Sequence, residues 1–333
     1  MKISASIYSD KKRSLKETIL DLKAHQVDLL HVDCNDDISV FEDIEKIREW
    51  CDLPIDLHII TETPEKFYSL LKKHPVEYVT FQQEQLPKDF LLPSDLPGKK
   101  GLAIITPTPI EVFDRYNGFD FILFMATTPG QSGGVFTAEN FKKIRLFKKK
   151  YPLVKVHVDG GVNGEVSFIL RNMGVRASVS GSFLFKAASV GQALMDLTKR
   201  EITSQFQVKD FMHDREECPI ISLDELNLKN VLSAIENGAL GFVMVEENDQ
   251  FAGIISNADV RRGLLNCYPE LNDVDVKKWV NRNPLVLKDS DTVNSMLLLV
   301  KEQAFSPMYL PVVNENGNSA GVVTFLNLIK GEV

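Results

Sequence analysis

The sequence lacks the features of a membrane-spanning or secreted chain. It contains no run of about 18 apolar residues, so no membrane span is expected. Its first residues, MKISASIYSDKKRSLKE, do not contain the apolar core of a signal peptide. The cysteines are scattered and fit neither a metal-binding nor a disulfide spacing; they are Cys34, Cys51, Cys218 and Cys267. A reducing, cytoplasmic location is therefore predicted.

Basic residues are outnumbered by acidic ones. The chain has 38 Lys and Arg against 46 Asp and Glu, which gives a net charge of −8. This balance argues against nucleic acid or an anionic membrane as the main partner. A phosphorylated ligand would need local hydrogen-bond donors instead of a basic surface.

The first 200 residues alternate short apolar runs with longer amphipathic ones. Strand–helix alternation of this kind predicts parallel βαβ units, and eight of them favour a closed (β/α)8 TIM barrel over residues 1–200. The eight candidate strands begin at Lys2, Asp28, Ile55, Tyr78, Lys100, Phe119, Val154 and Arg176.

The pattern changes after the segment 202–207, which we interpret as a linker. Residues 209–264 contain a strand-like segment, a helix and two strands, and residues 276–333 repeat that order. A repeat of about 60 residues predicts a second, smaller α/β module over residues 208–333.

Polar side chains gather at predicted strand ends, where active sites of such barrels lie. His31 and Asp33 are two residues apart and therefore face the same side of one strand, as do Asp56 and His58 on the next. Asp159 ends the seventh strand. A lone strand-end histidine or aspartate is usually structural, but the convergence of several favours a site for a divalent metal such as zinc, manganese, iron or cobalt.

Glycines follow the last three strands of the predicted barrel, where backbone N–H groups can bind phosphate. Each glycine pair alone could form an ordinary tight turn. Their joint position favours a phosphate-binding role for Gly133, Gly134, Gly160, Gly161, Gly181 and Ser182.

Six segments in order resemble motifs of the ribulose-phosphate 3-epimerase family. They are SASIYS, LLHVDCNDD, PIDLHII, FMATTPGQSGGVF, VKVHVDGGV and SGSFLF, and they extend over about 190 residues. The resemblance implies a metal-dependent TIM barrel that inverts C3 of a ketose phosphate, such as a pentulose 5-phosphate.

The resemblance also implies roles for individual residues. His31, Asp33, His58 and Asp159 would be the metal ligands. Asp33 and Asp159 would also be the acid–base pair, one removing the proton at C3 and the other returning it from the opposite face through an enediolate. Ser6 would donate a hydrogen bond near the substrate, although an ordinary strand hydroxyl is an equal alternative.

Several positions depart from the family motifs. Asn35 and Asp37 replace a methionine and a glycine, Ile60 replaces a methionine, and Gln82 stands where the family has a histidine. Gln131 replaces a phenylalanine in the phosphate loop. The implied metal ligands are all present, whereas positions that would surround the substrate are altered. This combination favours a changed substrate, and loss of activity is the alternative.

The repeat over residues 208–333 resembles a tandem pair of CBS domains, which usually bind an adenosine nucleotide in the cleft between the copies. By this resemblance Ser256, Asp259 and Thr324 would contact the nucleotide, whereas Asn327 replaces the second acidic residue. Ser-x-x-Asp is also a common helix N-terminus, so a purely structural role for Ser256 and Asp259 is an equal alternative.

The resemblance as a whole predicts an epimerase with a nucleotide-responsive C-terminal module, assembled as a homo-oligomer. The main alternative is a non-catalytic sensor that uses the barrel to bind a sugar phosphate. A related aldolase or decarboxylase is disfavoured, because those barrels often need a strand-end lysine that the sequence does not show.

Overall fold

The computed structural model describes residues 1–129, 133–198, 205–270, 274–305 and 307–325. The chain forms two compact units that divide near residue 202. None of the helices in the described ranges is both long and apolar enough to cross a membrane.

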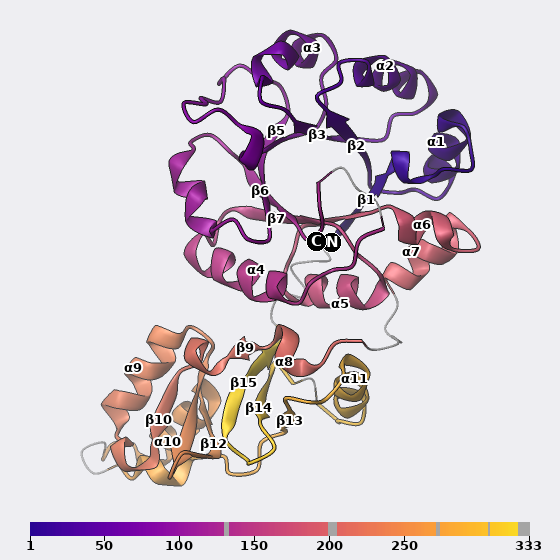
Figure 1. Ribbon diagram of the computed structural model, residues 1–333. Helices are drawn as coiled ribbons and strands as arrows, with labels where there is room; N and C mark the ends of the chain where they lie inside the picture. The colour runs from indigo at the N-terminus through magenta and orange to yellow at the C-terminus, as the bar shows by residue number, and fades with distance from the viewer. Residues whose placement is uncertain (130–132, 199–204, 271–273, 306, 326–333) are drawn as a thin grey trace. The chain divides into compact units, whose positions relative to one another are not determined.

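The first unit is a closed barrel of eight parallel strands, numbered in the order in which they pair around the ring (Figure 1). The fold class predicted from the sequence is confirmed, and each strand begins within two residues of its predicted start. The strands are β1 Lys2–Ser6, β2 Leu29–Asn35, β3 Ile55–Ile60, β4 Tyr78–Gln82, β5 Lys99–Ile105, β6 Phe121–Met125, β7 Lys155–Asp159 and β8 Ala177–Ser180.

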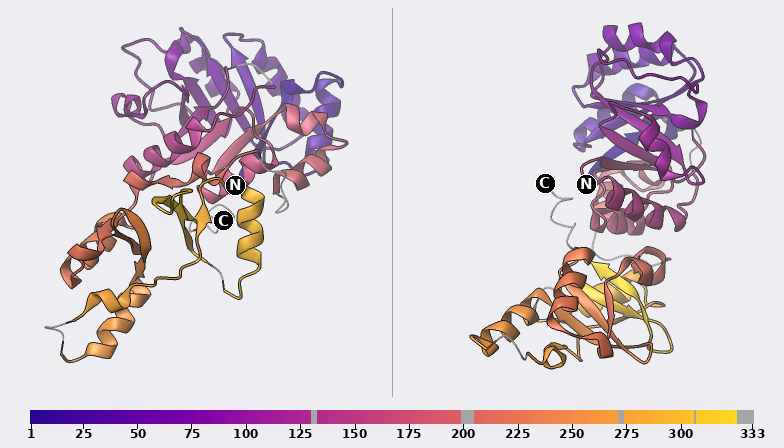
Figure 2. Two further views of the ribbon diagram at one scale, coloured as in Figure 1. Left: turned by 60° about the horizontal axis from the view of Figure 1, so that its bottom comes forward. Right: turned by 90° about the vertical axis from the view of Figure 1, so that its left-hand side faces the viewer.

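Amphipathic helices surround the strands (Figure 2). Helix α2, for example, buries Phe41, Ile44 and Ile47 while its charged residues face solvent. The α-helices of this unit are α1 Leu15–Ala24, α2 Val40–Trp50, α3 Tyr68–Lys73, α4 Glu139–Lys150, α5 Gly164–Asn172, α6 Ser182–Lys186 and α7 Val190–Thr198; short 3-10 turns η1 Ile7–Ser9 and η2 Pro64–Phe67 precede α1 and α3.

Two connections of the barrel contain no α-helix. The chain between β4 and β5 forms only the 3-10 turn η3 Gln83–Gln85, and that between β5 and β6 only η4 Ile110–Arg115. Prolines at 87, 93, 97, 107 and 109 explain the difference, because proline removes a backbone donor and fits poorly inside a helix.

Aromatic packing fills part of the barrel interior. Phe121 stacks on His157 with ring centroids 4.2 Å apart and meets Tyr78 edge-on at 5.8 Å. Gly101 leaves room for this ring, because a Cβ at that position would lie 2.3 Å from Phe121. His157 is thus a packed strand histidine, and burial lowers its pKa to about 4.

The second unit contains two copies of one arrangement. The first copy pairs β10 Ile220–Ser222, β11 Phe242–Glu247 and β12 Gln250–Ser256, and the second pairs β13 Leu287–Lys288, β14 Tyr309–Val313 and β15 Ser319–Thr324. The remaining elements are α8 Val208–Phe211, β9 His213–Asp214, η5 Arg215–Glu217, η6 Leu223–Glu225, α9 Leu228–Gly238, α10 Asn257–Cys267, η7 Val276–Trp279 and α11 Val293–Lys301.

The two copies exchange their leading segments. Strand β9, which precedes the first copy, pairs with β15 of the second (Figure 1). In return, Asn281, which precedes the second copy, forms two backbone hydrogen bonds with Ile254 of β12, at 2.8 and 3.0 Å. The exchange fastens the copies to one another through backbone pairing as well as through apolar contact.

A glycine permits each of these contacts. A Cβ at Gly253 would lie 2.3 Å from the carbonyl oxygen of Asn281, and one at Gly321 would lie 2.0 Å from that of His213. Both glycines open the Gly-hydrophobic-hydrophobic-Ser/Thr segments of the sequence repeat. The repeated glycine therefore has a steric cause.

We predict that Gly321→Ala destabilises the second unit by about 1–3 kcal/mol, because the new methyl group forces β9 away from β15. Hydrogen exchange read by mass spectrometry should become faster at residues 213–214 and 319–324 and stay unchanged in the barrel strands. Glu315→Ala is the control, since it changes an exposed side chain in the turn between β14 and β15 and leaves every glycine in place. Equal effects of the two substitutions would contradict the steric explanation.

Candidate metal centre and active site

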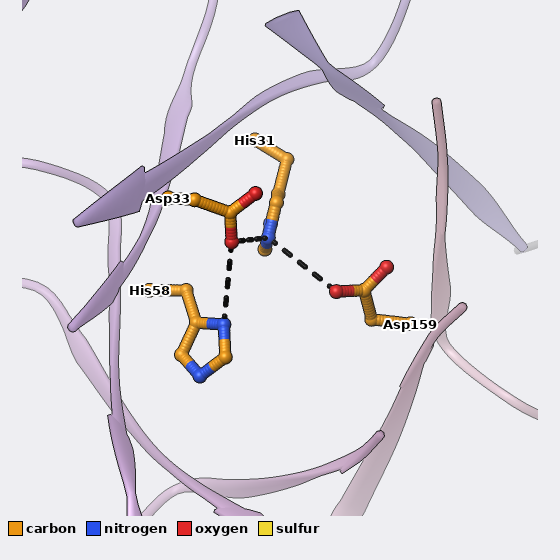
Figure 3. Close-up of side chains that lie close together, drawn as sticks. All are labelled: His31, Asp33, His58 and Asp159. Atoms are coloured by element: carbon orange, nitrogen blue, oxygen red, sulfur yellow. Dashed lines mark ion pairs between the residues drawn. The ribbon is translucent and has the colours of Figure 1, made fainter. Parts of the chain in front are cut away.

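The register between β2 and β3 brings two pairs of polar side chains together. His31 lies opposite Asp56, and Asp33 lies opposite His58. Because alternate residues of a strand share a face, all four point into the barrel. Asp159, at the end of β7, reaches the same point from the other side of the ring (Figure 3).

Four of these residues could hold one metal ion. His31, Asp33, His58 and Asp159 each offer one ligand atom, and these atoms lie within 4.8 Å of one another. Nε2 of His31 is 3.3 Å from Oδ1 of Asp33 and 3.8 Å from Oδ2 of Asp159, and Nδ1 of His58 is 3.5 Å from Oδ1 of Asp33.

Three of the atoms that face this point are buried and have no hydrogen-bond partner among the described residues. They are Nε2 of His31, Oδ1 of Asp33 and Nδ1 of His58. A buried polar atom without a partner costs roughly 1–3 kcal/mol, and three together would be expensive unless a ligand satisfies them. Two imidazole nitrogens and two carboxylates are a fitting donor set for a divalent cation such as zinc.

The outer nitrogen of each imidazole meets an acceptor. Nδ1 of His31 lies 3.0 Å from a carboxylate oxygen of Asp56, which also accepts from the hydroxyl of Ser4. Nε2 of His58 lies 2.9 Å from the amide oxygen of Gln82. In its neutral form each ring can donate its proton outwards and turn a lone pair towards the centre, which is the arrangement of metal-binding histidines.

Negative charge dominates the site electrostatically. Burial raises the pKa of Asp159 to about 6, and the nearby Asp33 adds to the shift. Burial also acts to raise the pKa of Asp33, but the charge of His31 outweighs it and holds that pKa well below its usual range. The pKa of His31 is raised well above its usual value, because Asp33 and Asp56 outweigh its burial. A divalent cation would neutralise this excess.

The structure gives supporting roles to residues that spacing alone did not assign. Asp56 was recognised as facing the barrel interior, but its contact with His31 depends on the strand register. Gln82, predicted among the altered positions around the substrate, instead contacts His58 and is only 2% exposed.

The mouth of the barrel brings Ser6 close to the chain after β8. Ser6 pairs with His31 in the strand register, and its hydroxyl lies 3.0 Å from that of Ser9. A Cβ on Gly181 would lie 2.3 Å from the Ser9 hydroxyl and 3.1 Å from Cβ of Ser6. Gly181 directly precedes Ser182, the first residue of α6.

The other predicted phosphate-binding glycines lie in loops that pack on one another. A Cβ on Gly134 or Gly160 would come within 2.5 Å of the Thr127 side chain. Gly160 and Gly161 also have φ angles of +105° and +66°, which favour glycine. Gly133 has φ +90° and open space around it. These loops therefore need glycine for steric reasons, and that need is compatible with phosphate binding.

The remaining altered positions lie at the strand ends. Asn35 and Asp37 are exposed, and Ile60 is half-buried. Asp37 accepts a hydrogen bond from the backbone N–H of Ser39 at 2.9 Å. Gln131 lies outside the described residues.

In the second unit, the residues predicted to bind a nucleotide flank an aromatic pair. Phe242 stacks on Tyr309 with ring centroids 4.1 Å apart. In the strand pairing, Ser256 is opposite Phe242 and Thr324 is opposite Tyr309. The repeat thus places the two hydroxyl residues at equivalent positions around one stack.

Asp259 is occupied by local contacts. One of its carboxylate oxygens accepts from the backbone N–H of Ser256 at 2.9 Å and from its hydroxyl at 2.5 Å, which forms a capping box at the start of α10. Its other oxygen accepts from Arg262. Ser256 and Asp259 therefore cap helix α10 in this chain, and a ribose would have to compete with these hydrogen bonds.

Comparison with known proteins supports the predicted family of the barrel and the predicted CBS character of the second unit. The model of the Ribulose-phosphate 3 epimerase family matches residues 2–185, and that of the CBS domain matches residues 275–332, the second copy. The same order of elements in residues 208–267 indicates a related first copy.

Two curated relatives match the barrel along nearly their whole length. Ribulose-phosphate 3-epimerase of Bacillus subtilis is 26% identical over 213 residues, which are 59% of this chain and 98% of the relative. The Methanocaldococcus jannaschii protein of the same name is 29% identical over 226 residues, 64% of this chain and 95% of the relative.

We predict that zinc or manganese stabilises the barrel. A cation at 100 times its dissociation constant should add about 2.7 kcal/mol to the free energy of unfolding, because it binds only the folded site. Thermal melting of protein stripped with a chelator, before and after metal addition, measures this. His58→Ala should abolish the increase, whereas His25→Ala, which changes an exposed histidine outside the site, should retain it. An equal increase in both variants would place the metal elsewhere.

Proposed function

Because the chain belongs to the ribulose-phosphate 3-epimerase family, we propose that its barrel is a metal-dependent epimerase that inverts C3 of a ketose phosphate. The observation that carries the proposal is the convergence of two carboxylates and two imidazoles on one point, with three atoms left unpartnered.

His31, Asp33, His58 and Asp159 would hold the cation. When bound, the cation supplies Lewis-acid polarisation of the substrate's carbonyl oxygen, which is typically worth several kcal/mol. Asp33 and Asp159 would move the protons. Since they project from β2 and β7, they approach the site from different sides.

Inversion needs two proton-transfer groups in opposite states at the start of a turnover. One carboxylate must be ionised to remove the proton at C3, while the other must carry a proton to deliver to the opposite face. The two carboxylates differ in their surroundings, since Asp33 faces both imidazoles at 3.3 and 3.5 Å, whereas of the two imidazoles only that of His31 lies within 4.0 Å of Asp159, at 3.8 Å. Either residue can begin the reaction, because an epimerase works in both directions.

The phosphate group would bind the backbone N–H groups of the loops that follow β6, β7 and β8. These loops contain Gly133, Gly134, Gly160, Gly161 and Gly181, and Ser182 begins the helix that follows Gly181. Ser6, beside Gly181, would contact the substrate between the phosphate and the metal. Binding by backbone donors suits a chain with net negative charge.

We further propose that the sugar differs from that of the typical family member. Asn35 and Asp37 put polar, exposed side chains where the family has methionine and glycine, and Ile60 shortens another position. Such changes would alter contacts with the distal part of the sugar and leave the metal site intact.

We propose a regulatory role for the second unit, in which an adenosine nucleotide binds beside Ser256 and Thr324. The support is their equivalent placement around Phe242 and Tyr309. We also propose that the chain forms a homo-oligomer, as members of both families usually do.

The epimerase proposal predicts that solvent deuterium enters C3 of one member of a panel of ketose phosphates. Nuclear magnetic resonance of the sugar measures the exchange. Asp33→Asn and Asp159→Asn should each slow epimerisation by about 10²–10⁴-fold, since each removes a positioned proton-transfer group. Asp52→Asn is the control, because that side chain is 93% exposed.

Different outcomes distinguish the rival functions. If metal-loaded protein binds a sugar phosphate tightly but no deuterium enters C3, the chain is a non-catalytic sensor and not an epimerase. Deuterium exchange at the wild-type rate in both Asp33→Asn and Asp159→Asn would show that neither aspartate transfers the proton.

The regulatory proposal predicts measurable binding of AMP, ADP or ATP by calorimetry. Thr324→Val should weaken it about three- to tenfold, as expected for the loss of one hydrogen bond. Ser319→Ala removes another buried hydroxyl from the same strand and should change nothing. Absence of binding by all three nucleotides would refute this part of the proposal.

A further inference from the structure

A chain of hydrogen bonds runs outward from His58 to the next strand connection. The amide oxygen of Gln82 lies 2.9 Å from Nε2 of His58, and the amide nitrogen of Gln82 donates to Oε2 of Glu84. Oε1 of Glu84 accepts from the backbone N–H of Ile105 at 3.1 Å and from the hydroxyl of Thr108. The chain therefore links the ends of β4 and β5 to a candidate metal ligand.

The direction of this chain is set by Glu84. An amide can turn over and exchange its oxygen and nitrogen, whereas an ionised carboxylate only accepts hydrogen bonds. Glu84 therefore holds the NH2 group of Gln82 on its own side. The amide oxygen is left facing His58, and an oxygen at that position requires a proton on Nε2 of the ring.

This proton position matters for metal binding. A neutral imidazole carries one proton, so protonation at Nε2 leaves the lone pair on Nδ1. Nδ1 is the buried atom that faces Asp33 at 3.5 Å and has no hydrogen bond. With Gln82 turned over, its NH2 group would favour the opposite tautomer, and a proton on Nδ1 would stand where the metal should be.

We propose that Glu84 is a positioning residue that acts through Gln82 to fix the tautomer of His58 and so presents Nδ1 to the metal. The inference rests on the proposed metal-dependent function. The two ligand histidines then differ in their support: His31 meets the carboxylate of Asp56 directly, whereas His58 meets a neutral amide whose orientation depends on a second residue.

Histidine tautomers in metal-free protein test the inference directly. Nitrogen-15 magnetic resonance of labelled histidines should show His58 protonated at Nε2 in the wild type. Glu84→Gln should raise the fraction protonated at Nδ1, because a neutral amide no longer fixes Gln82. The nitrogen-15 signals of His31 should stay unchanged in every variant and so report that the site is still folded.

Metal affinity provides the second measurement. Calorimetric titration with zinc should give about 10–100-fold weaker binding for Glu84→Gln, the usual effect of losing an outer partner of a ligand histidine. The matched control is Thr80→Val. Thr80 is fully buried on the same strand and face as Gln82, and its hydroxyl has no partner among the described residues.

A double variant separates positioning from general damage. Combining Gln82→Glu with Glu84→Gln exchanges the two groups, so a carboxylate at position 82 accepts from His58 and the amide at position 84 donates to that carboxylate. Zinc affinity should return to within about threefold of the wild type. A structural role alone would not be rescued by this exchange.

Three results would overturn the inference: an unchanged His58 tautomer in Glu84→Gln, unchanged zinc affinity in that variant, or failure of the exchanged pair to restore binding. If the wild type binds no metal but Glu84→Gln still shifts the His58 proton from Nε2 to Nδ1, the positioning role of Glu84 is upheld and the proposed function is refuted.

Discussion

The register between β2 and β3 is the constraint on which the barrel's chemistry depends. It places His31 beside Asp56 and Asp33 beside His58, so each histidine has a carboxylate neighbour on the adjacent strand. A shift of β3 by one residue would turn Asp56 and His58 from the interior to the helix-covered face. The apolar residues between them, Val32 and Leu57, are fully buried against that face and oppose such a shift.

The concentration of buried polar groups opposes stability and has to be compensated. Several buried polar groups of the barrel form hydrogen bonds, as between Ser4 or His31 and Asp56 and from Gln82 to Glu84. Among the described residues, three buried side-chain atoms without a hydrogen bond converge at the open end of the strands, on His31, Asp33 and His58. Buried polar atoms without hydrogen bonds lower the stability of the fold, and such locally unfavourable arrangements are expected at functional sites.

The second unit obeys a different constraint, the internal symmetry of a repeat. Gly253 and Gly321 admit equivalent backbone contacts, and Ser256 and Thr324 take equivalent places around a stacked aromatic pair. The equivalence ends at Asp259, whose capping contacts serve the helix α10 of the first copy. A ligand contact at Asp259, as the resemblance implies, would therefore compete with helix capping.

The sequence alone determined the eight strands, the repeat and the family motifs, because alternation of apolar and polar residues follows directly from strand and helix geometry. It also identified the four residues of the candidate metal site through their spacing and resemblance. Tertiary structure decided the rest. The partners of the histidines and the route from His58 through Gln82 to Glu84 depend on the strand register. Contacts between residues far apart in the chain are fixed only when the barrel closes, since spacing along one strand cannot show what faces it on the next.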